Sequence, residues 1–163
     1  MKNKGFSLIE MVIVLVLLGL SVALVTPSLS RFSKRIELKT AAQKVSGILR
    51  FFRSESVQKG KVFQVLFDPD LRLVRARALE RDSPEKEGRE ELKIQEKRYV
   101  LPSGIQMGEV KIPSPEFPSD LPTIEFYPHG GSNGGTIVLE MQDQKGYRIK
   151  VHFLTGMVEI EAV

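Results

Sequence analysis

A single acid stands inside an apolar stretch of membrane length near the start of the chain. Residues 6–25 carry no charge except that of Glu10. A carboxylate in lipid costs about 2.5 to 3.5 kcal/mol at a helix centre, so an acid in such a segment needs a partner or a function. As a helix, the stretch from Phe6 to Thr26 would span about 31 Å, which matches the apolar core of a bilayer. The spacing therefore predicts a membrane helix with one buried charge near its start.

The residues in front of this stretch are basic, and they differ from an ordinary secretory signal. Lys2 and Lys4 precede the apolar run and would stay in the cytoplasm by the positive-inside bias. A secretory signal carries a small-residue cleavage site after its apolar core, and none follows this run. We therefore expect the apolar run to remain in the protein as a membrane anchor.

A second group of residues matches a hydrolase pattern. Residues 130–134 read Gly-Gly-Ser-Asn-Gly, with Asp143 and His152 following in the order of a catalytic triad. A nucleophilic serine of this kind needs a strand, a sharp turn and then a helix, whereas residues 136–139 favour a strand. The pair Asn133-Gly134 is also a strong hairpin signal. The sequence therefore predicts a glycine-rich hairpin here, no catalytic residue and no enzyme.

Metal and cofactor sites are not indicated. His129 and His152 are the only histidines, and neither has a cluster of further ligands near it in the sequence. The segment Asp68-Pro69-Asp70 is typical of a turn and offers too few oxygen ligands for calcium. There is no cysteine, so no disulfide or thiolate site exists. We expect no metal and no cofactor.

The net charge of +4 does not favour nucleic acid as a partner. Lys2 and Lys4, ahead of the apolar run, contribute two of these charges, and the C-terminal segment 158–163 is acidic and apolar. Basic residues just after the apolar run are typical of a solvated face near lipid head groups: Arg31, Lys34, Arg35, Lys39 and Lys44. The charge pattern therefore does not predict nucleic-acid binding.

A long amphipathic helix is predicted from Ser28 to about Gln58. Pro27 falls at the end of the apolar run, where a proline invites a kink, and Gly60 provides a stop signal. Apolar residues recur at three- and four-residue steps: Leu29, Phe32, Ile36, Ala41, Val45, Ile48, Leu49 and Phe52. This stripe is expected to pack against a sheet.

Strand patterns dominate the rest of the chain. Alternating or β-rich runs separated by turn residues occupy residues 62–67, 71–77, 99–101, 105–112, 123–127, 137–141, 147–153 and 157–161. The last three are expected to form an antiparallel meander. Residues 81–97 are a dense charge run, predicted to be a solvated loop, and four prolines between residues 113 and 122 mark an irregular crossing. The predicted fold class is α+β, with a long N-terminal helix packed on one antiparallel sheet or a two-sheet head.

Both ends of the chain resemble a known family. The string Lys4-Gly5-Phe6-Ser7-Leu8-Ile9-Glu10 resembles the type III signal of the type IV pilin superfamily. The segment Phe126-Tyr127-Pro128-His129-Gly130 and the ending Thr155-Gly156-Met157-Val158 resemble the GspH/FimT group of that superfamily. The charged middle, residues 79–122, is not covered by the resemblance.

The resemblance implies a processing site and an assembly residue. Prepilin peptidase would remove the leader, residues 1–5, by cutting between Gly5 and Phe6, and Phe6 would then be N-methylated. Glu10 would pair with the Phe6 amine of a neighbouring subunit. Residues 6–27 would form the transmembrane and assembly helix. The periplasmic domain, residues 28–163, would hold the amphipathic helix 28–59 and the β-rich head 61–163.

The resemblance also implies a function in secretion. The expected role is that of a minor pseudopilin at or near the tip of the type II secretion pseudopilus, which supports export of folded proteins across the outer membrane. The alternative is a type IV pilus minor pilin that acts in filament priming, DNA uptake or adhesion. Expected partners are other minor and major pseudopilins, prepilin peptidase, the inner-membrane assembly platform and membrane lipid. The expected location is the bacterial inner membrane, single-pass, with a cytoplasmic N-terminus and a periplasmic C-terminal domain that joins the pseudopilus.

Overall fold

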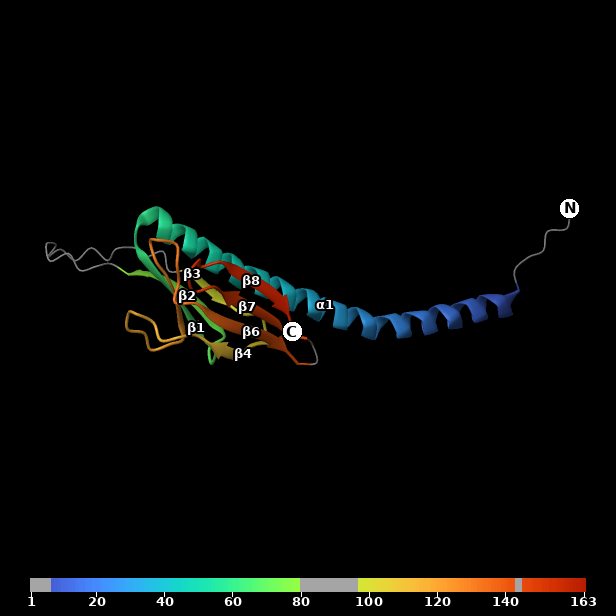
Figure 1. Cartoon of the computed structure of the whole chain (residues 1–163). Coiled ribbons are helices and arrows are strands. Elements are labelled where there is room, and N and C mark those ends of the chain that lie inside the picture. The colour runs from blue at the N-terminus through green and yellow to red at the C-terminus, as the bar shows by residue number, and fades with distance from the viewer. Residues whose placement is uncertain (1–6, 80–96, 143–144) are drawn as a thin grey trace, which may run out of the picture. The chain divides into compact units, whose positions relative to one another are not determined.

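The computed structural model describes residues 7–79, 97–142 and 145–163, and within them it leaves out the side chains of residues 22–31. The chain divides into two compact units, residues 1–36 and 37–163. Helix α1 (Leu8–Lys59) begins in the first unit and runs on into the second (Figure 1). The two predicted helical parts are therefore one element, and helical structure continues through Pro27.

Helix α1 ends where the sequence predicted. Its last residue is Lys59, and Gly60 follows with a φ of 62°. A residue in this left-handed region commonly closes a helix, and glycine adopts it without the strain that a Cβ would cause. The charge of Lys59 in the last turn also suits the negative end of the helix dipole.

The part of α1 in the second unit buries one apolar face. Its buried side chains recur at helical spacing: Leu38, Ala41, Ala42, Val45, Leu49 and Phe52. The predicted stripe was wrong at its start, because Phe32 and Ile36 are 62% and 50% exposed. Both belong to the first unit, which has no sheet to cover them. The pattern missed Leu38 and Ala42, which are fully buried.

Two four-stranded antiparallel sheets form the rest of the second unit (Figure 1). The first sheet has the order β3-β2-β1-β5, with β1 (Val62–Asp68), β2 (Leu73–Leu79), β3 (Lys97–Val100) and β5 (Thr123–Phe126). The second has the order β4-β6-β7-β8, with β4 (Ile105–Lys111), β6 (Gly135–Met141), β7 (Tyr147–Val151) and β8 (Val158–Ala162). The two-sheet form of the predicted α+β head is confirmed.

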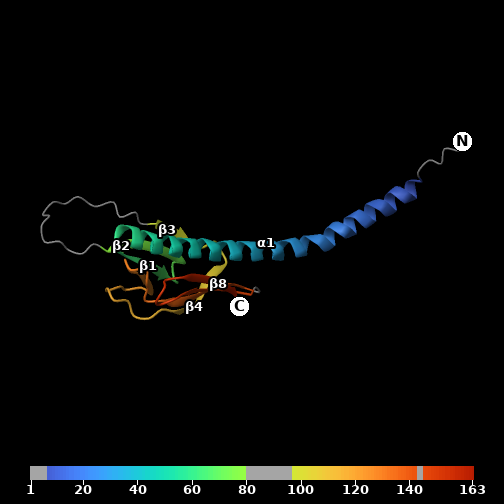
Figure 2. The same ribbon diagram turned by 45° about the horizontal axis from the view of Figure 1, so that its top comes forward.

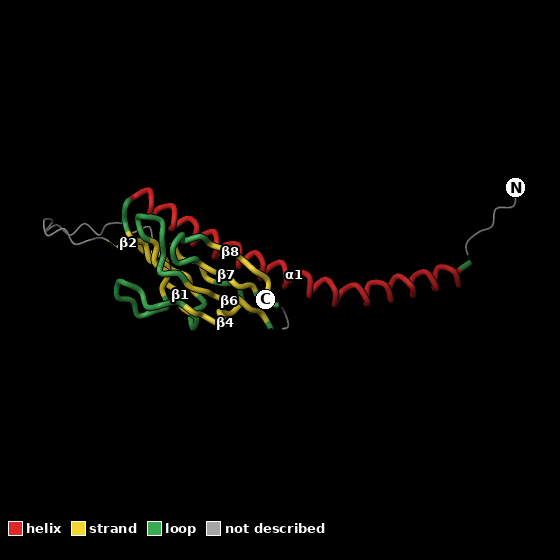
Figure 3. The backbone as a smooth tube through the Cα atoms, in the orientation of Figure 1, coloured by secondary structure: helices red, strands yellow, loops and turns green. Residues whose placement is uncertain are grey.

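The predicted meander is the continuous part of the second sheet. Strands β6, β7 and β8 pair in chain order, with Ile137 opposite Ile149 and Ile149 opposite Ile160. The backbone trace shows β6, β7 and β8 as neighbouring strands of one sheet (Figure 3). Strand β4 pairs with the free side of β6 across a register shift between Met107 and Val110.

One hydrophobic core joins the helix to both sheets. It includes Leu49 from α1, Val65 and Phe67 from β1, and Ile137 and Ile149 from the second sheet, all with 0% exposure. Helix α1 lies along one side of the strands in both views of the second unit (Figures 1 and 2). Burying these side chains removes a large apolar area from water, which is the main force that holds the head together.

Candidate functional site

The first candidate is the start of α1, where the sequence placed the processing and assembly residues. Gly5 and Phe6 lie outside the described residues. Glu10 lies in the first turn of the helix, and its backbone N–H donates to the Ser7 carbonyl at 3.0 Å. A negative charge at this position interacts favourably with the positive end of the helix dipole. The geometry therefore puts the acid within the first turn of the described helix.

The helix surface around Glu10 is apolar and exposed. Between Leu8 and Leu20 the large apolar side chains are 43% to 84% exposed. A helix that is apolar on every side is stable in lipid or among other apolar helices, but not in water. Across the residues open to description, however, no helix is long and apolar enough to cross a membrane.

The glycine-rich segment at residues 130–134 is structural, and a strand follows it as predicted. Ser132 is 1% exposed, and its hydroxyl accepts a hydrogen bond from the Gly134 backbone N–H at 3.0 Å. The Ser132 N–H donates to the Phe153 carbonyl at 2.9 Å. Of the other triad candidates, Asp143 lies outside the described residues. Strand β6 begins at Gly135, so the helix that a nucleophilic serine requires is replaced by a strand.

The two histidines have local partners. His152 places its Nε2 atom 3.1 Å from the Glu159 carboxylate across the turn between β7 and β8. This pairing holds the pKa of the Glu159 carboxyl below its usual value. The His129 ring stacks on the Tyr127 ring, with centroids 5.5 Å apart. Within the described residues, no three or more His, Cys, Asp or Glu side chains gather in a way that could hold a metal ion.

A buried carboxylate that sequence reasoning missed lies on β5. Glu125 has 0% exposure, and one of its oxygens accepts from Gln64 Nε2 at 2.9 Å and from the Phe117 N–H at 3.1 Å. The other oxygen accepts from the Glu116 N–H at 2.7 Å and from the Tyr127 hydroxyl at 3.0 Å. Burial, and then this hydrogen bond to Glu125, raises the pKa of Tyr127.

Two of these four donors, the Glu116 and Phe117 N–H groups, explain the position of the proline-rich segment. Residues 113–122 form no strand, as predicted, and Glu125 fixes their backbone against the first sheet. Asn133 fixes another point, because its amide donates to the Thr123 and Pro113 carbonyls at 2.9 and 3.3 Å. A carboxylate that already accepts four hydrogen bonds has little capacity left for acid–base chemistry, so we assign Glu125 a structural role. The sequence offers no signal for its burial, because Glu125 alternates with the core residues Ile124 and Phe126 and is therefore expected to face away from the core.

Comparisons with known proteins agree with the resemblance noted in the sequence. Residues 1–26 match the family model of the prokaryotic N-terminal methylation motif. Type II secretion system protein H of Xanthomonas campestris pv. campestris is 24% identical over 155 residues, which cover 95% of this chain and 81% of that protein.

Two solved structures share the fold. The minor pseudopilin EpsH of the Vibrio cholerae type 2 secretion system matches with a TM-score of 0.55 at 20% identity, covering 77% of this chain and 97% of that one. The type IV minor pilin FimU of Pseudomonas aeruginosa matches with a TM-score of 0.56 at 14% identity, covering 81% of this chain and 96% of that one. The chain therefore carries a prokaryotic N-terminal methylation motif and shares its fold with EpsH and FimU.

Proposed function

We propose that this chain is an H-type minor pseudopilin, a structural subunit at or near the tip of a type II secretion pseudopilus. The observation that carries the proposal is the combination of a methylation motif at residues 1–26 with a similarity to protein H along 95% of the chain. The EpsH-like head supports the same assignment. The role is assembly rather than catalysis, and the subunit supports the export of folded proteins.

The N-terminus is the processing site in this proposal. Prepilin peptidase cuts between Gly5 and Phe6, and Phe6 is then N-methylated. The cut removes two lysines with the leader and leaves an apolar segment with a new amine at its start. Glu10, in the first turn of α1, then lies about one helical turn from that amine.

Glu10 directs assembly by pairing with the Phe6 amine of a neighbouring subunit. A carboxylate and an ammonium are each costly in lipid, and pairing relieves both costs. Because the two charges belong to different subunits, the pairing favours one axial stagger between adjacent helices. The exposed apolar surface between Leu8 and Leu20 supplies the remaining contact area with lipid and with sibling subunits.

The proposed location follows from the same segment. Residues 6–27 anchor the chain in the bacterial inner membrane as a single span, with the N-terminus in the cytoplasm and residues 28–163 in the periplasm. An inner-membrane assembly platform then adds the subunit to the pseudopilus, beside other minor and major pseudopilins.

A second candidate is a minor pilin of a type IV pilus. The likeness of the head to FimU favours it, since its TM-score of 0.56 is close to the 0.55 found for EpsH. In that role the chain would act in filament priming, DNA uptake or adhesion.

A deletion strain separates the two candidates. Exported proteins are compared between periplasm and culture supernatant, with and without the wild-type gene supplied in trans. Accumulation in the periplasm that the gene reverses supports the pseudopilin. Unchanged secretion together with lost surface filaments or DNA uptake supports the minor pilin and overturns the first proposal.

A further inference from the structure

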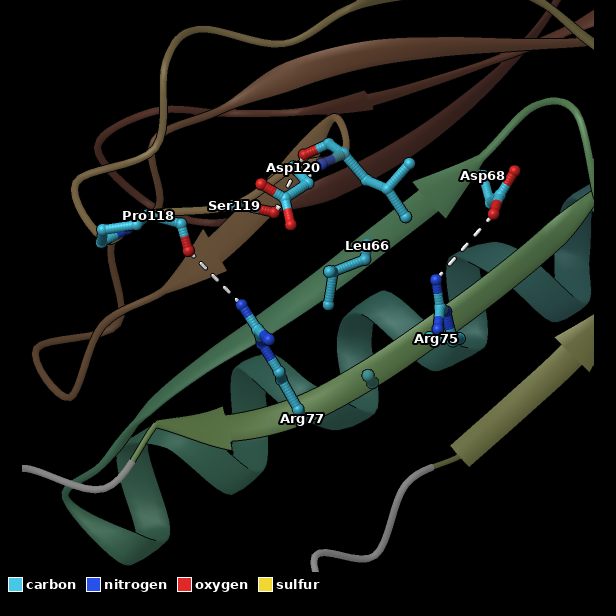
Figure 4. A pocket seen from close by; sticks show the side chains of 9 residues that line it. Leu66, Asp68, Arg75, Arg77, Pro118, Ser119 and Asp120 are labelled. Atoms are coloured by element: carbon cyan, nitrogen blue, oxygen red, sulfur yellow. Dashed lines mark hydrogen bonds and ion pairs between the residues drawn. The ribbon is translucent and has the colours of Figure 1, made fainter.

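A groove lies on the face of the first sheet that points away from the helix. It runs between β2 and residues 118–121 and has a volume of about 490 Å³ (Figure 4). The side chains that matter for its chemistry are Leu66, Asp68, Arg75, Arg77, Asp120 and Leu121. The groove belongs entirely to the second unit and is remote in the sequence from the N-terminal motif.

Strand alternation places two arginines side by side in this groove. Val74 and Ala76 of β2 are buried in the core, with 1% and 0% exposure. Arg75 and Arg77 therefore point to the opposite face. The register puts Leu66 of β1 opposite Arg75, which gives the arginine an apolar neighbour on the groove floor.

Arg77 has a structural role, because it donates hydrogen bonds within the head. Its Nε donates to the Gln64 side-chain carbonyl at 2.8 Å, and one of its terminal nitrogens donates to the Pro118 carbonyl at 3.4 Å. Since Gln64 also donates to Glu125, Arg77 extends the polar network that fixes the proline-rich segment. Arg77 thus holds one wall of the groove in place.

Arg75 has unused hydrogen-bonding capacity. The distance from its Nη2 to the Asp68 carboxylate is 3.9 Å, too long for a hydrogen bond. Its Nε is buried and has no acceptor among the described residues. Asp68 directs its other oxygen to the Leu71 backbone N–H at 3.0 Å and so is tied to the turn. The end of the guanidinium therefore keeps its terminal N–H donors free beside an apolar floor, and such a group can bind a carboxylate through two parallel hydrogen bonds from its two Nη atoms.

We propose that this groove binds an extended segment of a partner protein that presents a carboxylate to Arg75 and apolar side chains to Leu66 and Leu121. Asp68 and Asp120 line the same groove, and their charges disfavour a polyanion that carries a negative charge at every unit, such as nucleic acid. One acidic side chain between apolar ones meets this repulsion with a single charge, and Arg75 is the group that offsets it. The proposal goes beyond the proposed function and holds for either kind of filament.

The test uses two matched peptides and the full chain in detergent micelles. The probes are blocked peptides of sequence Gly-Leu-Glu-Leu-Gly and Gly-Leu-Gln-Leu-Gly, and the readout is the NMR signal of the Arg75 Nε–H group. We expect the Glu peptide to shift this signal in a saturable way, and the Gln peptide to bind at least tenfold more weakly. Equal shifts from both peptides would overturn the proposal.

Variants test whether the Arg75 guanidinium is the group that binds the peptide carboxylate. Arg75→Gln should abolish saturable binding; because this variant lacks the Arg75 signal, its binding is measured from the backbone amide signals of β1 and β2. Arg75→Lys keeps the positive charge but loses the planar guanidinium, so it should bind the Glu peptide more weakly than the wild type. Arg148→Gln changes a partly exposed arginine on the second sheet and should leave binding unchanged. Binding that persists in Arg75→Gln contradicts the proposal, as does a twelve-residue oligothymidylate that binds more tightly than the Glu peptide. If Arg75→Gln does not fold, the comparison of the Glu and Gln peptides on the wild-type chain still tests the proposal.

Discussion

At the scale of single residues, two acids in apolar surroundings have opposite roles. Glu125 is fully buried, and four donors from the chain itself surround its carboxylate. Glu10 lies on an exposed apolar helix that the rest of the described chain does not cover. A buried charge is stable only with partners. Folding supplies the hydrogen-bond donors of Glu125, whereas in our proposal assembly supplies the partner of Glu10.

Replacing Glu10 should therefore affect assembly and leave processing intact. We expect Glu10→Ala to be cleaved normally, and its cross-linking to sibling subunits in isolated membranes to fall at least about tenfold, which corresponds to about 1.4 kcal/mol. Glu109→Gln, which removes an exposed acid on β4, is the matched control and should cross-link like the wild type. Normal cross-linking of the Glu10 variant would contradict the hypothesis that Glu10 pairs with the Phe6 amine of a neighbouring subunit.

Replacing Glu125 should instead affect the stability of the head. In Glu125→Gln one carboxylate oxygen becomes an amide that faces N–H donors, so we expect the free energy of unfolding to fall by about 1.5 to 3 kcal/mol. The Glu116 and Phe117 N–H groups donate to different oxygens of Glu125, so hydrogen exchange should accelerate at the one of these two amides whose acceptor oxygen is replaced. Chemical denaturation of the full chain in detergent measures the first effect. If Glu125→Gln lowers the free energy of unfolding no more than Glu109→Gln does, the hydrogen bonds to the Glu125 carboxylate contribute little to stability.

At the scale of elements, local patterns predicted the helix, the strands and the pairing of strands that follow one another closely, but not the pairing of strands far apart in the sequence. The stop at Gly60, the β6–β7–β8 meander and the strand after the 130–134 loop were each predicted from neighbouring residues, and each is confirmed. The order β3-β2-β1-β5 brings together strands up to about sixty residues apart, and no local signal encodes that contact. A helical period likewise cannot tell where along α1 the sheets begin, and the stripe was therefore wrong at Phe32 and Ile36.

Of the candidate sites, one was predicted from the sequence and the others became visible only in the fold. The assembly residue Glu10 was predicted because one charge in an apolar run is visible in the sequence alone. The Glu125 network and the groove at Arg75 were not, because they need β1, β2 and β5 side by side with the proline-rich segment laid over them. Alternation along β2 does indicate that Arg75 and Arg77 share a face, but what lies opposite that face comes only from the fold.

The helix face that packs on the sheets should carry much of the stability of the head. Leu49 has 0% exposure, so Leu49→Ala should lower the free energy of unfolding by about 2 to 5 kcal/mol through lost burial and the cavity left behind. Ile36→Ala, at a half-exposed position before the sheets, should cost less than about 0.5 kcal/mol. Equal losses at both positions, measured by denaturant unfolding, would mean that the core extends further along α1 than the structure places it.

At the scale of the whole molecule, the chain consists of a unit that folds on itself and a unit that does not. Residues 37–163 have their own core and polar network, while the described residues before Ile36 expose their apolar side chains. In our proposal, the residues that direct assembly belong to the first unit, within the methylation motif at residues 1–26. Folding of the head and competence for assembly should therefore be separable by mutation.

Replacing Gly5 tests this separation directly. We expect Gly5→Val to block cleavage, because in our proposal the peptidase cuts between this residue and Phe6, so that intact-protein mass spectrometry finds the leader retained and Phe6 without its methyl group. The uncleaved chain has no free amine at Phe6 for Glu10 to pair with, so secretion should fail to the level of the deletion strain. The midpoint of denaturant unfolding should match that of wild type, since Gly5 lies outside the unit that holds the core. A variant that is cleaved and secretes normally would refute the processing site, and a shifted midpoint would show that the two units fold together.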